Sequence, residues 1–396
     1  MANRVAQWLA IGVMVSLTAC GGGSSSTNSG GGPPNSQKVI SLYPAGSASG
    51  NRLYVMATSV GSTAVSMPLI FDTGSAGITL YAPDIFPSSI VSSSGFVFPT
   101  GETSISYGGI TVTNQQGTRS YGGANGTTQV GNIGYTTVTF GDSSGTLTTS
   151  TMPVLLYYST LHTATGQPIS PVPQQGIFGV NSVTNVIAEA GSTEPATGYP
   201  PCSQQSTGSC RVVSVLKYVQ YGQGIHAGFL LTPSALQSCD ITTAGSCAPQ
   251  PMLTVGLTSA RESGFSTADL TCPPPANTYV GPPSIDGYPV CLAVIPQTTI
   301  AVSGLATGTL TGDVLFDTGT PFMTVSVPAG VSFPASIPAG ADVSITTPSG
   351  FTYSYTAAPG IANTVVNFTS TSIVGVAYFT TNSLFVDYQT STEGWK

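Results

Sequence analysis

The sequence of 396 residues predicts a mainly β protein built from two related halves. Three observations support this prediction. Short apolar runs separated by turn residues recur along the chain, as in proteins made of short strands. The composition favours strands and turns, with 48 Gly and only 6% charged residues. Finally, the segment Phe-Asp-Thr-Gly occurs twice, at residues 71–74 and 316–319, which indicates two copies of one structural unit.

The N-terminal segment indicates export rather than a folded element. Arg4 precedes a mostly apolar run that is too short for a comfortable membrane span and ends in Leu-Thr-Ala-Cys. This end resembles a bacterial lipobox, so residues 1–19 are interpreted as a signal peptide and Cys20 as the lipidated residue. An ordinary signal peptide that happens to contain a cysteine is the alternative. No Asp follows Cys20, which by resemblance favours the outer membrane or cell envelope of a Gram-negative bacterium.

Three further segments are predicted beyond the signal peptide. Residues 20–37 are rich in Gly, Ser, Asn and Pro, and we interpret them as a flexible tether between lipid and folded body. Residues 38–200 are predicted to form an N-terminal β lobe with the first Asp-Thr-Gly loop. Residues 201–396 are predicted to form a C-terminal β lobe with the second. The boundary falls in a Pro-rich, loop-like stretch.

Strand signals dominate the two predicted lobes, and helical periodicity is rare. Val183–Ala190 is the best short helix candidate. Two Tyr-Gly-Gly turns begin at Tyr107 and Tyr121. The clearest strand signals lie at 53–56, 65–71, 79–81, 131–140, 152–158, 175–180, 228–231, 252–257, 299–302, 343–355, 373–379 and 384–387.

Charge and cysteine content exclude some functions. The formal net charge is −7 and the chain has only 8 Lys and Arg, so nucleic acid is a poor partner. Six cysteines remain after Cys20, and they allow fifteen pairings. They flank three short loops, which favours sequential disulfides: Cys202 with Cys210, Cys239 with Cys247 and Cys272 with Cys291. A zinc site is disfavoured, because no Cys-x-x-Cys occurs and neither His162 nor His226 is beside a cysteine.

The two Phe-Asp-Thr-Gly segments are the candidate active site. Each is an apolar strand that ends in a carboxylate at a glycine turn, and a buried carboxylate needs compensating donors. Two such segments suggest that Asp72 and Asp317 meet. A pair of carboxylates that shares one proton can activate a water and protonate a leaving nitrogen.

These motifs resemble those of pepsin-like aspartic proteases. Phe71–Ser75 is similar to the first catalytic loop of that family, and Phe316–Thr320 to the second. Gly176–Val180 resembles the strand that closes the psi loop of the first lobe, and Ser372–Asp387 resembles the C-terminal psi-loop strand and the strand after it. The resemblance implies a bilobal fold with the active site at the lobe junction. It also implies acid-favouring endopeptidase activity on polypeptides, without a metal or cofactor, in a monomer.

The resemblance also assigns roles around the aspartates. Two threonines would hydrogen-bond across the lobe junction, two glycines would permit the turns and offer backbone N–H groups, and two hydroxyl residues would donate to the carboxylates. These pairs are Thr73 and Thr318, Gly74 and Gly319, and Ser75 and Thr320. Ser75 and Thr320 could alternatively be plain turn residues.

A flap tyrosine is expected as well. Tyr121 is the better candidate and Tyr107 the alternative, because the chain after Tyr121 resembles the strand that follows the flap in the family. Thr79 stands where pepsin has the tryptophan that supports this tyrosine.

Two other functions stay open at this point. One is a catalytically weak or inactive surface lipoprotein that binds peptides or a partner protein. The other is a structural or adhesive β protein, which would require the two Asp-Thr-Gly loops to lie far apart.

Overall fold

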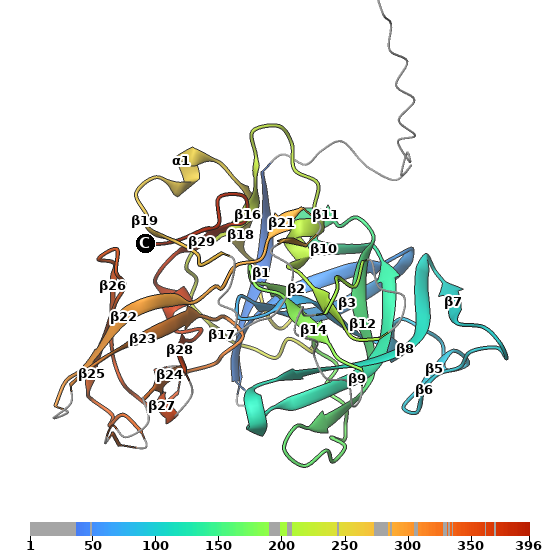
Figure 1. Cartoon of the computed structure of the whole chain (residues 1–396), viewed down its shortest axis with the longest axis horizontal. Coiled ribbons are helices and arrows are strands. Elements are labelled where there is room, and N and C mark those ends of the chain that lie inside the picture. The colour runs from blue at the N-terminus through green and yellow to red at the C-terminus, as the bar shows by residue number, and fades with distance from the viewer. Residues whose placement is uncertain are drawn as a thin grey trace, which may run out of the picture. The chain divides into compact units, whose positions relative to one another are not determined.

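Strands make up most of the protein (Figure 1). A computed structural model describes residues 37–47, 50–189, 199–203, 208–243, 245–272, 284–285, 287–304, 308–327, 331, 333–334, 336–360, 362–367 and 370–396. The predicted signal peptide, Cys20 and the tether lie outside these residues, apart from Gln37. The side-chain amide of Gln37 donates to the carbonyl oxygen of Gly256 at 3.0 Å. The chain is therefore already bonded to the folded body at the last residue of the predicted tether.

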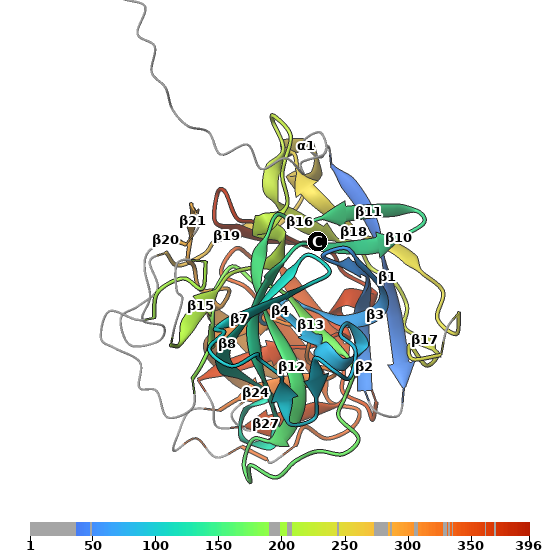
Figure 2. The ribbon, with the colours of Figure 1, turned by 90° about the vertical axis from the view of Figure 1, so that its right-hand side faces the viewer.

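Within the described residues, the largest sheet has 17 strands and draws on both halves of the sequence. Strand β1 connects its parts, because its first half pairs with β18 and its second half pairs with both β2 and β17 (Figure 2). The strands are β1 (Lys38–Ser47), β2 (Gly50–Val60), β3 (Thr63–Asp72), β4 (Ala76–Tyr81), β7 (Ser104–Tyr107), β8 (Ile110–Tyr121), β9 (Thr127–Thr136), β10 (Val138–Asp142), β11 (Gly145–Thr148), β12 (Met152–His162), β13 (Gly176–Val180), β16 (His226–Leu231), β17 (Gln237–Ser238), β18 (Gln250–Leu257), β19 (Ser266–Asp269), β29 (Leu384–Asp387) and β30 (Thr392–Trp395).

A second sheet belongs to the C-terminal part of the chain and appears in orange and red in Figure 1. Its strand order is β26-β25-β22-β23-β28-β24-β27. The bounds are β22 (Ile295–Val302), β23 (Thr309–Phe316), β24 (Met323–Ser326), β25 (Asp342–Thr346), β26 (Thr352–Thr356), β27 (Thr364–Asn367) and β28 (Thr371–Val374). Among the described residues, three strand pairs lie outside these two sheets: β5 (Val91–Ser92) with β6 (Gly95–Phe96), β14 (Asn185–Ile187) with β15 (Cys210–Val212), and β20 (Ser284–Ile285) with β21 (Tyr288–Pro289).

Helical elements are short. The described residues contain one α-helix, α1 (Ser259–Glu262), and four 3₁₀ turns: η1 (Ala82–Asp84), η2 (Gly123–Asn125), η3 (Val215–Tyr218) and η4 (Tyr378–Thr380). In the part of the chain that the structure describes, no helix has the length and hydropathy that crossing a membrane requires.

Two predictions of secondary structure are wrong. The helix candidate Val183–Ala190 instead contains strand β14, in which Ile187 pairs with Cys210 of β15. Pairing with a distant strand overrides the weak local helix signal. The predicted strand at 373–379 ends at Val374, whose carbonyl oxygen accepts a hydrogen bond from the backbone N–H of Asp317 at 2.9 Å. Beyond Val374 the chain turns away from the sheet and forms η4.

Each Asp-Thr-Gly loop follows a phenylalanine that is anchored in the core. The Phe71 ring lies 6.1 Å from the Phe178 ring and 5.9 Å from the Phe229 ring, measured between centroids. Phe316 likewise packs against Tyr378 at 4.8 Å and Trp395 at 5.6 Å. Both phenylalanines are almost completely buried. The strand ends that carry the aspartates are therefore held by aromatic packing.

The two loops occupy equivalent positions in equivalent strand units. Strand β3 pairs in parallel with β13, which pairs antiparallel with β4. Strand β23 pairs in parallel with β28, which pairs antiparallel with β24. A Cβ on Gly179 would lie 2.7 Å from the carbonyl oxygen of Ser75, and one on Gly375 would lie 2.2 Å from that of Phe322. Glycine is required at both places because the backbones approach so closely.

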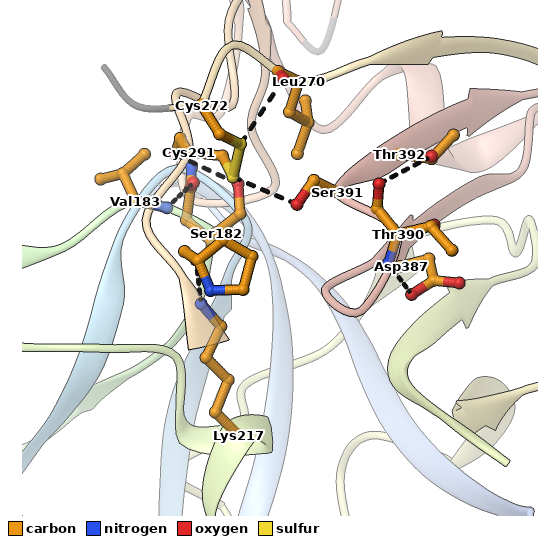
Figure 3. The surroundings of a disulfide bond; sticks show 12 residues. Ser182, Val183, Lys217, Leu270, Cys272, Cys291, Asp387, Thr390, Ser391 and Thr392 are labelled. Carbon is orange, nitrogen blue, oxygen red and sulfur yellow. Dashed lines mark hydrogen bonds between the residues drawn. A yellow bond between two sulfur atoms is a disulfide. The ribbon is translucent and has the colours of Figure 1, made fainter. Parts of the chain in front are cut away.

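Three disulfides close the predicted loops, with the predicted pairing: Cys202–Cys210, Cys239–Cys247 and Cys272–Cys291. Figure 3 shows the last of these beside Ser182, whose hydroxyl donates to the carbonyl oxygen of Cys291 at 3.4 Å. In the same view the Lys217 ammonium group donates to the carbonyl oxygen of Pro289 at 3.1 Å. Residues 34–396 form one compact unit, and a lobe boundary at residues 200/201 stays a prediction.

Candidate active site

The two Asp-Thr-Gly loops hydrogen-bond to each other through their threonines. The Thr73 hydroxyl donates to the carbonyl oxygen of Phe316 at 2.8 Å, and the Thr318 hydroxyl donates to that of Phe71 at 2.6 Å. Each hydroxyl also accepts a bond from the backbone N–H of the opposite threonine, at 3.0 Å in both directions. Four reciprocal bonds between residues about 245 positions apart thus fix the relative position of the loops.

Each carboxylate receives the same two local donors. Asp72 accepts from the backbone N–H of Gly74 at 2.8 Å and from the hydroxyl of Ser75 at 2.5 Å. The matching bonds to Asp317 come from the N–H of Gly319 at 2.7 Å and the hydroxyl of Thr320 at 2.6 Å. Hydrogen bonds donated to a carboxylate favour its ionised form and orient it.

The two aspartates contact each other. Their carboxyl groups lie within hydrogen-bonding reach, and the side chains are only 6% and 8% exposed. Burial, followed by the charge of Asp72, raises the pKa of Asp317 well above its usual range. Two buried carboxyl groups in contact resist double ionisation, so the pair retains one proton. This arrangement is the opposite of the distant loops that a purely structural β protein would have.

Glycine is required at the turn of each loop. A Cβ on Gly74 would lie 2.5 Å from Cγ of Asp317, and a Cβ on Gly319 would lie 2.5 Å from Oδ1 of Asp72. Both distances are far shorter than a carbon–oxygen or carbon–carbon contact allows. Each turn glycine therefore leaves the space into which the opposite carboxyl group fits.

Tyr121 lies near the first aspartate. Burial raises the pKa of the Tyr121 hydroxyl to about 12, and the Asp72 carboxylate contributes in the same direction. Within the described residues the buried hydroxyl has no hydrogen-bond partner, although Thr79 is its neighbour. Tyr107 packs instead against Phe86, with ring centroids 5.4 Å apart. The role of Tyr121 as a flap residue stays a prediction.

Two residues near the site were not singled out from the sequence. Arg119 is 3% exposed, and its guanidinium donates to the carbonyl oxygen of Ala76 at 2.8 Å and stacks on the Tyr121 ring at 5.0 Å. It connects the Tyr121 hairpin to the first loop. The Asn181 amide donates to the carbonyl oxygen of Thr73 at 2.7 Å. The sequence signal for Arg119 is a charged residue within a strand, which is rare in this chain. The signal for Asn181 is a polar residue directly after the apolar strand that ends at Val180.

One group of side chains in the described residues has the composition of a metal site. His226, Glu262 and Asp387 can each offer a ligand atom, all within 4.8 Å of one another. Nδ1 of His226 lies 2.7 Å from Oδ2 of Asp387, so these two residues form an ion pair when the histidine is protonated. None of the three belongs to the Asp-Thr-Gly loops. The expectation of a reaction without metal or cofactor stays a prediction.

Sequence comparison does not identify a family for this chain. No protein-family model matches it, and no curated protein matches it either. The structure, in contrast, is similar to that of an aspartic proteinase from Irpex lacteus, with a TM-score of 0.51 and 13% sequence identity. The similarity covers 91% of this chain and 96% of that chain. The chain has the pepsin-like aspartic proteinase fold.

The prediction of a mainly β, bilobal pepsin-like fold is therefore confirmed. In the pepsin-like fold, the two equivalent strand units around β3 and β23 supply one aspartate each. A structural similarity at 13% sequence identity shows a shared fold but does not show a shared activity. Catalysis therefore has to follow from the residues of this chain.

Proposed function

We propose that the protein is an aspartic endopeptidase that hydrolyses peptide bonds and is most active at acidic pH. The observation that carries this proposal is the pair of contacting carboxyl groups, each with the same two donors. A purely structural or adhesive protein does not require Asp72 and Asp317 to be buried against each other. Such an arrangement costs free energy, because the two carboxylates repel each other and lose their hydration.

The chemistry needs only the pair and one water molecule. The ionised carboxyl group removes a proton from water, whose oxygen attacks the peptide carbonyl carbon, while the protonated carboxyl group donates to the carbonyl oxygen. As this tetrahedral adduct collapses, the C–N bond breaks, the nitrogen leaves with a proton from one carboxyl group, and a hydroxyl group of the adduct returns its proton to the other. The products are a carboxylic acid and an amine, and the pair again holds one proton. Asp72 and Asp317 titrate as a unit, so neither has a permanent role.

The charge state of the pair sets the pH range. Activity requires one proton on the pair, so it is lost when both groups are protonated and when both are ionised. The donors Ser75 and Thr320 favour the first ionisation. The raised pKa of Asp317 moves the second ionisation of the pair to higher pH. We therefore expect a bell-shaped profile that is high in acid and whose alkaline limb lies above the usual range for a carboxyl group.

The direct test uses the purified protein on denatured casein from about pH 3 to pH 8. Cleavage in acid should be blocked by pepstatin and unchanged by EDTA or by a serine-protease inhibitor. Loss of cleavage with EDTA would contradict the two-carboxylate mechanism. A pepstatin-induced rise in Tm without cleavage at any pH would show that the protein binds peptides but does not turn them over.

We also propose that the protein is an exported, monomeric lipoprotein, anchored in the outer membrane or cell envelope through Cys20. The lipobox-like run before Cys20 and the tether-like composition after it support this proposal. Mass spectrometry of the N-terminal peptide from membrane fractions should find a diacylglyceryl thioether on Cys20. An unmodified Cys20 in a membrane-free protein would contradict the proposal.

A further inference from the structure

Arg52 shares a sheet face with the first catalytic aspartate. Tyr54 of β2 pairs with Ile70 of β3 in antiparallel register. The β2–β3 pairing ends at these residues, and the same register extended by two residues would set Arg52 opposite Asp72. Residues two apart on a strand project to the same face, and directly paired residues do so as well. Arg52 and Tyr54 of β2 therefore project to the same face as Ile70 and Asp72 of β3. The residues between them, Leu53 and Phe71, are buried in the core.

The charge of Arg52 has no partner of opposite sign at ion-pair distance within the described residues. Its one hydrogen bond there runs from Nη1 to the carbonyl oxygen of Asn51, at 2.9 Å. Burial lowers the pKa of the guanidinium, while Tyr54, Asp317 and Asp72 act in the opposite direction. A guanidinium offers five N–H donors, and a partly buried one with a single protein bond has donors left for a ligand.

A cavity lies farther along the same face. Its volume is about 410 Å³, within the usual range for ligand sites. Tyr43, Met56 and Pro68 of β1–β3 line it, together with Thr242 and Thr243 of the loop closed by Cys239–Cys247. Pro68 precedes Asp72 by four residues, which is roughly 13 Å along an extended strand. A peptide bound in extended form could thus place neighbouring residues at the aspartates, at Arg52 and in the cavity.

We propose that Arg52 is a carboxylate-binding subsite that selects polypeptide substrates with an acidic side chain near the scissile bond. The inference rests on the proposed function, because it places the peptide across Asp72 and Asp317. A carboxylate from Asp or Glu of the substrate would take up the free donors of Arg52 in a two-pronged hydrogen-bonded pair. The loop closed by Cys239–Cys247 would then hold the adjacent part of the peptide.

The test uses blocked peptides in matched pairs that differ only by Glu or Gln at one position, moved along the peptide. The wild type should prefer Glu at one position by about tenfold or more in kcat/KM, the range expected for a charged hydrogen bond. In Arg52→Gln this Glu/Gln ratio should fall to near one. Arg261→Gln, which removes an exposed arginine of α1, should leave the ratio as in the wild type.

The following results would overturn the carboxylate subsite at Arg52 and would leave the proposed endopeptidase function unaffected. Equal cleavage of both peptides at every position would exclude a carboxylate subsite, and a ratio that persists in Arg52→Gln would exclude Arg52. A variant that shifts the pH profile with an unchanged ratio would show that Arg52 acts on the aspartates instead.

If the wild type cleaves neither denatured casein nor any of the peptides, the proposed function fails and the subsite is tested by binding. Dissociation constants for the same pairs are then measured with the Asp317→Asn variant. A Glu preference that disappears when Arg52→Gln is added supports the subsite, and equal affinities overturn it.

Discussion

Replacement of either aspartate by asparagine is expected to lower peptide cleavage by at least about a thousandfold, because general acid–base catalysis by the pair is lost. Asparagine has the same shape and can still accept from the N–H of Gly74 or Gly319. It cannot exchange the proton that the mechanism moves. Asp317→Asn should also raise Tm at neutral pH, because it removes a carboxyl group that burial and Asp72 make costly to ionise. The measurements are kcat/KM on a fluorogenic peptide and calorimetry of the same samples.

Asp313→Asn is the matched control. It makes the same chemical change on strand β23, four residues before Asp317, where no role in the pair exists. Its kcat/KM should stay within about twofold of the wild type, as for a substitution outside the site. More than a tenth of the wild-type activity in Asp72→Asn or Asp317→Asn would refute the proposed mechanism.

The catalytic pair could be predicted because its chemistry is local. The segment Phe-Asp-Thr-Gly contains the core anchor, the carboxylate, the threonine that crosses to the other loop and the turn glycine in consecutive positions. The structure gives a physical reason for each, from the aromatic packing of Phe71 to the space that Gly74 leaves for Asp317. Local motifs of this kind are readable because nearly all the required contacts are made by the motif itself.

The surroundings could not be predicted to the same depth, because they depend on register. The alternation of Arg52, Tyr54 and Met56 with buried residues is visible in the sequence, but only the register of β2 against β3, extended beyond the Tyr54–Ile70 pair, directs Arg52 toward Asp72. The contact of Arg119 with Ala76 likewise requires β8 to pass the first loop. A one-residue change of register would turn each of these side chains to the other face.

The failed helix prediction has the same origin. Residues 183–190 have weak helical periodicity, and the disulfide Cys202–Cys210 holds β15 where β14 can pair with it. Local preference amounts to a few tenths of a kcal/mol per residue, roughly, which a strand pair and a cross-link readily exceed. Long-range pairing therefore decided the structure of this stretch.

Rising pH is expected to destabilise the fold through a second buried carboxyl group, Glu393. It lies on β30, is 3% exposed, and pairs across the sheet with Val386 and Ala268. Burial raises its pKa from 4.5 to about 8. The folded state therefore keeps a proton that the unfolded chain releases above about pH 4.5. Its contribution to stability is complete below that pH, falls as the pH rises, and is lost once the pH passes the folded pKa.

The expected loss of unfolding free energy between pH 4.5 and 8 is on the order of a few kcal/mol. Glu393→Gln should remove this slope, because a buried amide stays neutral at every pH. Glu102→Gln, an exposed control, should retain it. Asp317 contributes a slope of the same sign, so Glu393→Gln should flatten the profile in part and its combination with Asp317→Asn further. Urea unfolding at pH 4, 6 and 8 measures the effect, and a Glu393→Gln profile parallel to the wild type would show that the carboxyl group is already ionised in the folded protein.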